Sequence, residues 1–327
     1  MMDQFLVGVD LGGTNIKVSA YTFEDWTPVY ESRVPTEAQG GWEHVMNRIY
    51  NELIKLFQTV SKGQTACVGL GIPGLLDIET GISKFSPNFP SWENVPVVDW
   101  LQERLKLPVY IDNDVRVNLY GEWYCGAGKG RNNVVLLTLG TGLGSGIVMD
   151  GRVLYGATSS AGEVGHMNMV RTGGRPCKCG SSGCLGRYVS ALGLLRTLKE
   201  KLAGGTPCVI RDWVGGDLEK ITAKMVSDAY DTGDCVAVET MTETGELLGY
   251  GLVNVVNLFN PEIIIIGGGE AAAGDRLLQP ARRVVESHAL KLSREQCSVV
   301  TAQLGDSAGM LGAAIYAKQR LERGTRL

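Results

Sequence analysis

The sequence predicts an α/β fold, because short apolar segments typical of strands alternate with segments whose apolar residues recur at helical spacing. A length of 327 residues, 44% of them hydrophobic, supplies enough apolar material for two domains with separate cores. Residues 5–21 and 134–149 repeat one pattern of apolar strand, glycine-rich turn and apolar strand. Both copies of this weak internal duplication resemble β-hairpins whose turns expose backbone N–H groups.

The remaining elements follow in chain order. Apolar residues at helical spacing predict a helix over 45–60, and the next apolar segment, 66–72, predicts a buried strand that ends at Pro73 and Gly74. Residues 189–202 form another apolar-periodic segment, 247–258 a helix and 262–266 a strand that ends in three glycines. A last helix is expected over 308–323. We expect one domain to comprise 1–117 with 308–327, and the other to comprise 118–307.

Composition excludes several classes of protein. A formal net charge of −4 gives no basic surface for nucleic acid, and no apolar stretch is long enough to cross a bilayer. The N-terminal residues have no basic region or cleavage site of a secretory signal, so we expect a cytoplasmic protein without membrane partners. The 44 glycines cluster in turns, which suggests that backbone approaches a ligand closely.

His166, Cys177, Cys179 and Cys184 indicate a metal site in the loop 166–184. One imidazole and three thiols in the spacing His-x10-Cys-x-Cys-x4-Cys are the ligands of a tetrahedral structural Zn2+. The alternatives are a buried histidine near ordinary thiols and a disulfide framework, for which Cys177-x-Cys179 is poor geometry. The other cysteines, at 67, 125, 208, 235 and 297, are expected to be buried thiols, which fits a reducing compartment.

Three glycine turns follow apolar strands and favour a nucleotide, because turns of this kind hold phosphate oxygens by their backbone N–H groups. The phosphate-binding loop G-x4-G-K-[ST] and the His-Arg-Asp of protein kinases are both absent from the sequence. Taken singly, each glycine turn could equally be structural.

In order, the segments 10–17, 139–147 and 163–166 and the Cys177/Cys179/Cys184 cluster resemble the ROK family of sugar kinases and repressors over nearly the whole chain. The resemblance implies a pair of actin-like, hexokinase-like (ribonuclease H-like) α/β domains with an interdomain cleft and a structural zinc loop. It also implies ATP and Mg2+ as cofactors, with Asp10 near the Mg2+. The residues implied to bind the nucleotide are Gly12, Gly13, Thr14, Thr141, Gly142, Gly267 and Gly268. Lys17 could touch phosphate or be a solvated charge.

The same resemblance assigns the sugar site. Asp114 is the implied catalytic base and Asn113 an amide that orients the sugar hydroxyl, although Asp112-Asn113-Asp114 alone would read as a turn. Glu163 and His166 would hold further hydroxyls, with one His166 nitrogen on the zinc and the other on the sugar. Asn88 and the Gly74 backbone are secondary candidates.

We therefore expect an ATP-dependent hexokinase of the glucokinase type, acting on an aldohexose and most simply on glucose at its 6-hydroxyl. After Cys184-Leu185 the family usually has a glutamate, and Gly186 here leaves the sugar open. Mannose, fructose, N-acetylglucosamine and N-acetylmannosamine are alternative substrates, and a non-catalytic sugar-sensing protein is an alternative function. A DNA-binding repressor is not expected, since the first phosphate turn begins at Asp10. The family commonly forms homodimers or homotetramers.

Overall fold

A computed structural model describes residues 4–86 and 89–324, which fold into two compact units. The first unit comprises Met1–Gly130, Tyr155–Ala161 and Gln303–Leu327, and the second comprises Arg131–Leu154 and Gly162–Ala302. This division differs from the one expected from the sequence, because helix α3 (Asp114–Cys125) continues through residue 117 and lies wholly in the first unit.

The first unit is built on a five-stranded sheet in the order β3-β2-β1-β4-β8. Strands β1 (Phe5–Leu11), β2 (Asn15–Thr22) and β3 (Pro28–Pro35) are antiparallel neighbours, whereas β4 (Thr65–Ile72) and β8 (Val109–Asn113) run parallel to β1. A small antiparallel sheet comprises β5 (Leu75–Asp77), β6 (Ile82–Phe85) and β7 (Glu93–Val95).

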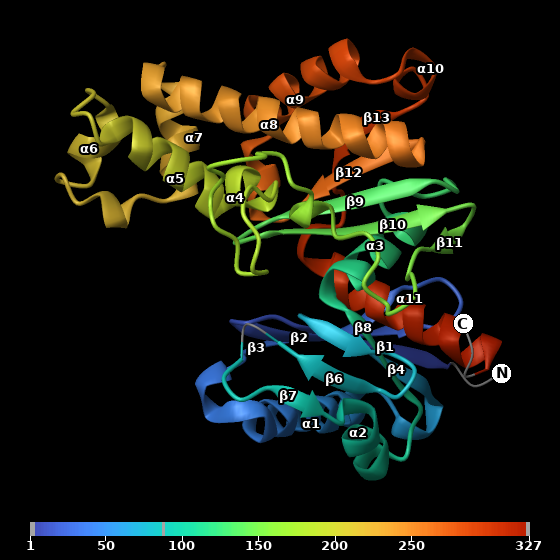
Figure 1. Cartoon of the computed structure of the whole chain (residues 1–327). Coiled ribbons are helices and arrows are strands. Elements are labelled where there is room, and N and C mark those ends of the chain that lie inside the picture. The colour runs from blue at the N-terminus through green and yellow to red at the C-terminus, as the bar shows by residue number, and fades with distance from the viewer. Residues whose placement is uncertain (1–3, 87–88, 325–327) are drawn as a thin grey trace. The chain divides into compact units, whose positions relative to one another are not determined.

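Helices cover both faces of this sheet (Figure 1). One face carries α1 (Gly41–Thr59) and α2 (Val97–Leu105), and the other carries α3 and α11 (Ala308–Arg323). The buried side of α1 follows the predicted period, with Val45, Ile49, Leu53 and Leu56 fully buried. Burial of each such side chain stabilises the folded state by about 1.5–3 kcal/mol relative to leaving it exposed. Short 3-10 turns occupy Ala38–Gly40, Lys62–Gln64 and Gly305–Ser307.

Helix α11 can lie close to its neighbours because small residues face them. A Cβ at Gly312 would stand 1.6 Å from the carbonyl oxygen of Val117 in α3, and one at Gly8 in β1 would stand 1.8 Å from the carbonyl oxygen of Met310. Real side chains do not tolerate such distances. The glycines therefore fix the approach of α11 to α3 on one side and to the sheet on the other.

The second unit repeats the topology of the first. Its sheet has the order β11-β10-β9-β12-β13, in which β9 (Val134–Leu139), β10 (Leu143–Met149) and β11 (Arg152–Val153) are antiparallel. Strands β12 (Ile263–Gly267) and β13 (Ser298–Thr301) run parallel to β9. The duplicated hairpins predicted from the sequence are confirmed as β1–β2 and β9–β10.

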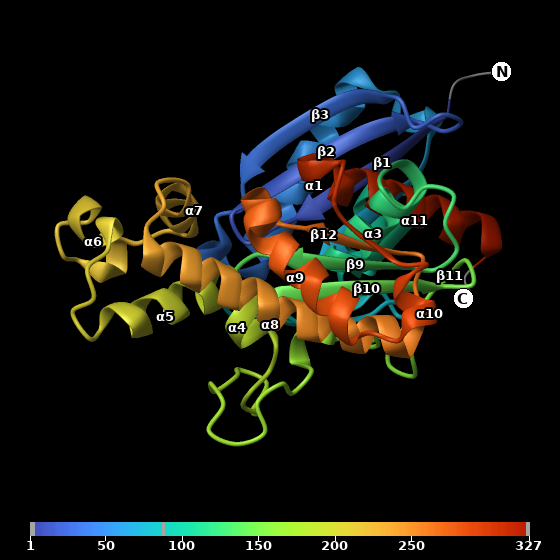
Figure 2. The ribbon, with the colours of Figure 1, turned by 90° about the horizontal axis from the view of Figure 1, so that it is seen from above.

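Helices α8 (Cys235–Phe259) and α9 (Asp275–His288) lie side by side over one face of the second sheet (Figures 1 and 2). Figure 2 shows α5 (Ala191–Leu202), α6 (Val209–Trp213) and α7 (Ala223–Asp231) grouped at the N-terminal end of α8. The remaining elements are α4 (Gly186–Val189), α10 (Lys291–Arg294) and 3-10 turns at Val164–His166, Leu218–Lys220 and Gly269–Ala273.

The other predicted elements are confirmed with small shifts. The helix 45–60 is α1, the strand 66–72 is β4, the strand 262–266 is β12, and the helix 308–323 is α11. The helix 247–258 is the second half of the longer α8, because Thr240 and Thr244 continue its buried face toward the N-terminus. Among the described residues, no helix combines the length and the apolarity needed to cross a bilayer.

Candidate functional site

The turn between β1 and β2 presents the first group of predicted nucleotide ligands. Gly13 and Thr14 are exposed, and the turn is stabilised by the Thr36 hydroxyl, which donates to the Gly12 carbonyl at 2.7 Å. The Thr36 amide donates to the Thr14 carbonyl at 2.8 Å. The hairpin is thus held by its carbonyl groups, and its tip is left accessible.

The second unit has an equivalent turn between β9 and β10. Thr141 and Gly142 are exposed, and the Gly140 amide donates to the Gly142 carbonyl at 2.9 Å. A Cβ at Gly142 would meet no atom within 4 Å, and its φ lies outside the left-handed region. Neither packing nor backbone conformation therefore requires glycine there, which fits a position kept open for a ligand.

The turn after β12 lies beside the turn after β9, because Gly267 pairs with Thr138 across the parallel strands. Gly268 has a φ of +83°, and a Cβ there would stand 2.3 Å from the Leu139 carbonyl oxygen. Only glycine fits this contact. The three residues Gly140, Gly142 and Gly268 thus line one end of the second sheet.

A cavity of about 400 Å³ adjoins this turn in the second unit. Gly269, Glu270, Lys224 and Arg276 line it, and its size is within the range of small-molecule sites. Burial raises the pKa of Glu270, the buried carboxyl of the cavity wall. The sequence singled out Gly267 and Gly268 and missed the cavity, whose walls come from α7 and from the start of the segment leading to α9.

In the first unit, Asp10 and Lys17 face each other across the β1–β2 pair. Lys17 Nζ lies 3.8 Å from Asp10 Oδ2 and 3.2 Å from Asp306 Oδ1. Burial raises the pKa of Asp10, Lys17 opposes that shift, and Asp306 adds to it. Lys17 is therefore a paired, half-buried cation and not a solvated one. Asp306 was not predicted, because 296 residues separate it from Asp10 in the sequence.

Asp112, Asn113 and Asp114 stand where β8 ends and α3 begins, so the turn interpretation is replaced by a strand-to-helix junction. The Asn113 side chain caps α3 and accepts from the Val115 amide at 2.9 Å. Its Nδ2 donates to the Gly74 carbonyl at 3.3 Å, which places two of the predicted sugar residues together. Asn88, another candidate, lies outside the described residues.

Asp114 is the first residue of α3 and is partly buried. Burial, and after it the charge of Asp10, raise the pKa of Asp114 to about 6, although the amides of Val115 and Asp114 and the charge of Arg116 oppose the shift. A carboxyl group whose pKa lies near neutrality can hold and release a proton at physiological pH. This makes Asp114 the strongest candidate for proton transfer among the predicted residues.

Asp112 has a different role from its neighbours. It is fully buried and accepts from Arg116 Nε at 2.6 Å and from the Tyr155 hydroxyl at 2.7 Å. Arg116 and Tyr155 were not predicted from the sequence. The opposite charges of Asp112 and Arg116, four residues apart, could have indicated that they pair. No pattern in the sequence indicated that Tyr155 binds Asp112.

Glu163 precedes the 3-10 turn Val164–His166 in the second unit and His166 ends it, and both residues are exposed. The turn is fixed from inside, because a Cβ at Gly165 would stand 2.2 Å from the Leu143 carbonyl oxygen. Ser145 holds the loop as well, donating from its hydroxyl to the Gly162 carbonyl and accepting from the Val164 amide at 3.0 Å. The exposed side chains of Glu163 and His166 thus project from a rigid base on β10.

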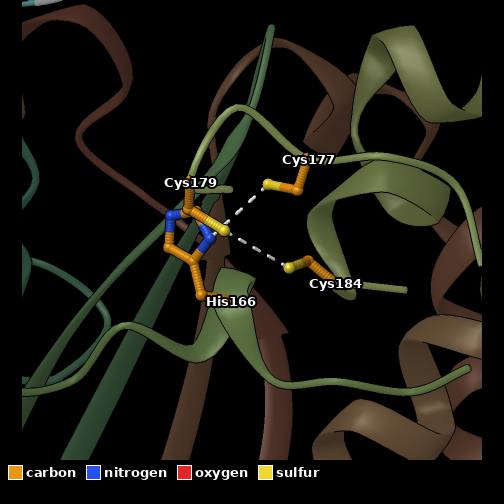
Figure 3. A group of neighbouring side chains, drawn as sticks. All are labelled: His166, Cys177, Cys179 and Cys184. Carbon is orange, nitrogen blue, oxygen red and sulfur yellow. Dashed lines mark hydrogen bonds between the residues drawn. The ribbon is translucent and has the colours of Figure 1, made fainter. Parts of the chain in front are cut away.

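Figure 3 shows the predicted metal ligands gathered around one point. The ligand atoms of His166, Cys177, Cys179 and Cys184 all lie within 4.8 Å of one another. Cys177 Sγ is 3.7 Å from His166 Nδ1, and Cys179 Sγ is 3.8 Å from Cys184 Sγ. Sulfur ligands about 2.3 Å from a tetrahedral Zn2+ are roughly 3.8 Å apart. The donor set and its spacing therefore fit zinc, with Nδ1 on the metal side and Nε2 on the other.

The disulfide alternative does not fit, because the three cysteines are free and the 3.8 Å between the sulfur atoms of Cys179 and Cys184 far exceeds the S–S bond length of about 2.05 Å. All eight cysteines are free. The expectation that the other five are buried holds only for Cys67 and Cys208, whereas Cys125 and Cys297 are partly exposed and Cys235 is exposed. Cys235 is exposed because it is the first residue of α8, ahead of the buried face.

Comparison with known proteins agrees with this duplicated fold. The chain is 37% identical over 325 residues to a glucokinase of Halalkalibacterium halodurans, covering 98% of this chain and 97% of the relative. A ROK family glucokinase from Streptomyces griseus, solved in complex with glucose and AMPPNP, matches with a TM-score of 0.79 and 33% identity, covering 96% of this chain and 99% of that one. A ROK family transcriptional regulator, a homologue of the E. coli MLC protein, matches with a TM-score of 0.86 and 26% identity, covering 98% and 79%.

The family model described as ROK family matches residues 6–320, which include both sheets, the glycine turns, the β8–α3 junction and the Cys3His cluster. By this match and the identity to full-length relatives, the chain belongs to the ROK family.

Proposed function

We propose that this protein is an ATP-dependent sugar kinase that transfers the γ-phosphoryl group to the 6-hydroxyl of an aldohexose, with glucose as substrate. The observation that carries the proposal is Asp114, a partly buried carboxyl with a pKa near 6 at the start of α3. Support comes from the glucokinase relative and from the similar structure that contains glucose and AMPPNP.

On the donor side, the glycine turns after β1, β9 and β12 bind the nucleotide in this proposal. Gly13, Thr14, Thr141 and Gly142 are exposed residues, and their backbone N–H groups suit phosphate oxygens. The cavity beside Gly269 suits the nucleoside, flanked by Gly267 and Gly268. Mg2+, when bound with ATP, neutralises phosphate charge. Asp10 offers the oxygen ligand, and Lys17 favours its ionised form by opposing the rise in pKa that burial causes.

On the acceptor side, Asp114 accepts the proton of the attacking hydroxyl, which leaves the oxygen free to attack phosphorus in line. Asn113 cannot offer Oδ1 freely, because that atom caps α3, but one Nδ2 hydrogen can still donate to a sugar oxygen. The Gly74 carbonyl holds the amide in place. Glu163 and Nε2 of His166 bind further hydroxyl groups in this proposal.

The Cys3His cluster is proposed as a structural Zn2+ site. The metal would tie the loop 166–184 to His166, and so would set the ring orientation from which Nε2 faces the sugar. We also propose a homodimer or homotetramer, as the family resemblance implies, which analytical ultracentrifugation of the purified chain would decide.

The test is ADP release with ATP and Mg2+ against a panel of glucose, mannose, fructose, N-acetylglucosamine and N-acetylmannosamine. Glucose should give the highest kcat/KM. A different preferred sugar would correct the substrate and keep the kinase, whereas no turnover with any of them would contradict the kinase. Sugar-responsive regulation is the second candidate, favoured by the fold similarity to the ROK transcriptional regulator. Sugar binding without turnover, in a protein that shifts a DNA fragment, would support it.

A further inference from the structure

The chain passes between the two units four times, after Gly130, Leu154, Ala161 and Ala302. Near each passage, a residue of the first unit is bound by a buried charged side chain of α3 or of the adjoining end of β8. The bound residues are Ala127, Tyr155, Ser159 and the pair Gln303 and Leu304.

Glu122 holds two of the four passages. Its side chain is buried in α3, and Oε2 accepts from the Ala127 amide at 2.9 Å. Oε1 accepts from the amides of Gln303 at 2.9 Å and of Leu304 at 2.7 Å. One carboxylate thus satisfies three backbone donors from two chain segments that are 176 residues apart in sequence. Charge-assisted bonds of this kind are about twice as strong as neutral ones.

Arg116 and Asp112 hold the other two passages. Arg116 is buried; its Nε donates to Asp112, and its Nη1 donates to the Ser159 carbonyl at 2.8 Å. Asp112 also accepts from the Tyr155 hydroxyl, whose ring lies 5.1 Å from the guanidinium carbon. The Ala161 amide donates to the Tyr155 carbonyl at 3.0 Å, so the segment 155–161 closes into a loop. Asp112 binds this loop at Tyr155, and Arg116 binds it at Ser159.

Two of the bound segments lead toward residues of the proposed site, whereas the segment at Ala127 leads into β9. The loop 155–161 precedes Glu163 and His166 in sequence, whereas Gln303 and Leu304 precede the turn that carries Asp306. Asp306 pairs with Lys17, and a Cβ at Gly309 would stand 2.7 Å from the Asp10 carboxyl carbon. The contacts of Arg116 and Asp112, here called the Arg116 clamp, therefore hold the segment that precedes the proposed sugar ligands. The contacts of Glu122, here called the Glu122 clamp, hold the segment that precedes the proposed nucleotide site around Asp10.

We infer that α3, whose first residue is Asp114, and the adjoining end of β8 together anchor all four passages, with Arg116 and Glu122 of α3 as positioning residues for phosphoryl transfer. The inference rests on the proposed function for the reaction that they serve. The geometry of the clamps lies wholly within the first unit and stands independently of that function. Arg116 fixes the loop that leads to Glu163, and Glu122 fixes the turn that leads to the Asp10 site.

Three full-length variants separate these roles. Arg116→Lys keeps the charge but offers a single nitrogen, which cannot replace donors at both Nε and Nη1. Glu122→Gln is isosteric, but its NH2 group cannot accept from a backbone amide. Glu79→Gln is the matched control. Glu79 pairs with the buried Arg320 of α11 at 3.0 Å in the same unit, and within the described part of the chain its hydrogen bonds and ion pair are with Arg320.

Amide hydrogen exchange reports on the clamps without any need for activity. Glu122→Gln should speed exchange at Ala127, Gln303 and Leu304 and leave Ala161 unchanged. Arg116→Lys should speed exchange at Ala161 and leave the other three amides unchanged. Kinetics with ATP and glucose report on positioning. Arg116→Lys should raise KM for glucose about tenfold or more with KM for ATP within about twofold, and Glu122→Gln should raise KM for ATP instead. Glu79→Gln should lower the melting temperature alone.

The inference is wrong if the two clamp variants behave as the control does, with lower melting temperatures and unchanged KM values. It is also wrong if exchange at the clamped amides does not respond. A wild-type protein that transfers no phosphate to any sugar of the panel would contradict the proposed function. In that case the positioning role falls with it, while the exchange data still decide whether α3 anchors the passages.

Discussion

The carboxylate of Asp10 opposes the ionisation of Asp114. Both residues belong to the first unit, and Asp10 is the largest contribution after burial among those that raise the pKa of Asp114 to about 6. Lys17 lies 3.8 Å from Asp10 and 3.2 Å from Asp306, so a series of charges connects the exposed Asp306 with the proposed base. The protonation of Asp114 therefore depends on the charge around Asp10.

Activity should follow the ionisation of Asp114. A general base accepts a proton only as the carboxylate, so kcat/KM for glucose should be constant above the pKa of about 6 and fall roughly tenfold per pH unit below it. The measurement is a pH profile of kcat/KM at saturating ATP. A flat profile from about pH 5 to about pH 7.5 would show that another group is the base.

Asp114→Asn should separate activity from stability. Turnover should fall by at least about 100-fold while glucose still binds, because the amide keeps the shape and cannot accept the proton. The pKa of Asp114 is raised in the folded state, so its charge destabilises the fold above that pKa and has no effect below the ordinary Asp pKa of 3.8. The variant should therefore melt higher than wild type at pH 7, by an amount that shrinks to nothing near pH 4.

Asp275→Asn is the matched control for that comparison. Asp275 is an exposed carboxylate in the first turn of α9, paired with Arg282 at 2.7 Å, and an exposed pair contributes about 1 kcal/mol or less. We expect normal turnover and a slightly lower melting temperature. If Asp114→Asn melts lower than wild type at pH 7, the burial cost assigned to Asp114 is wrong.

Cys179→Ser should remove the proposed zinc. Metal binding at such a site is coupled to folding, so the variant should contain less than one zinc per chain and melt about 5 °C or more below wild type. Elemental analysis and calorimetry make the two measurements. Cys235→Ser, at an exposed thiol outside the cluster, should keep both values. Equal zinc content in the two variants would argue against the Cys3His ligands.

Lys17→Met should weaken the use of Mg2+ at the proposed nucleotide site without weakening sugar binding. Lys17 lowers the pKa of Asp10, so its removal favours the protonated carboxyl and should raise the Mg2+ concentration needed for half-maximal rate by about threefold to tenfold. KM for glucose should not change. Arg33→Met removes the other cation beside Asp306, at 3.3 Å and largely exposed, and should change neither value. An effect on glucose instead would place Lys17 at the sugar.

Sequence periodicity was sufficient where one local pattern determines an element. Helix α1 and strands β4 and β12 were predictable because their buried faces repeat at a single period. The Cys3His site was predictable because three of its four ligands lie within eight residues. Helix α8 was only half predicted, since Thr240 and Thr244 are buried polar residues that bond to the carbonyl groups one turn earlier.

The long-range part of the site could not be read from the sequence. Tyr155 donates a hydrogen bond to Asp112, and the Leu304 amide donates one to Glu122, and no local spacing in the sequence predicts either contact. The N-cap role of Asn113 was also missed, although Asn before an apolar-periodic segment is a helix-start signal. The extent of the first unit was missed for the same reason, because the loop 155–161 joins it through long-range contacts with Asp112, Arg116 and Tyr120.

The central position of α11 has a consequence for biosynthesis. This helix is the last in the chain, yet it packs against β1, β4 and α3 through the glycine contacts at Gly8 and Gly312. A ribosome makes the N-terminal strands first, and they stay without their covering helix until the C-terminal residues emerge. Residues 162–302, by contrast, form one uninterrupted stretch of the second unit. Nascent chains arrested before residue 308 should therefore expose the apolar face of the first sheet to chaperones, and release of the finished chain should end that exposure.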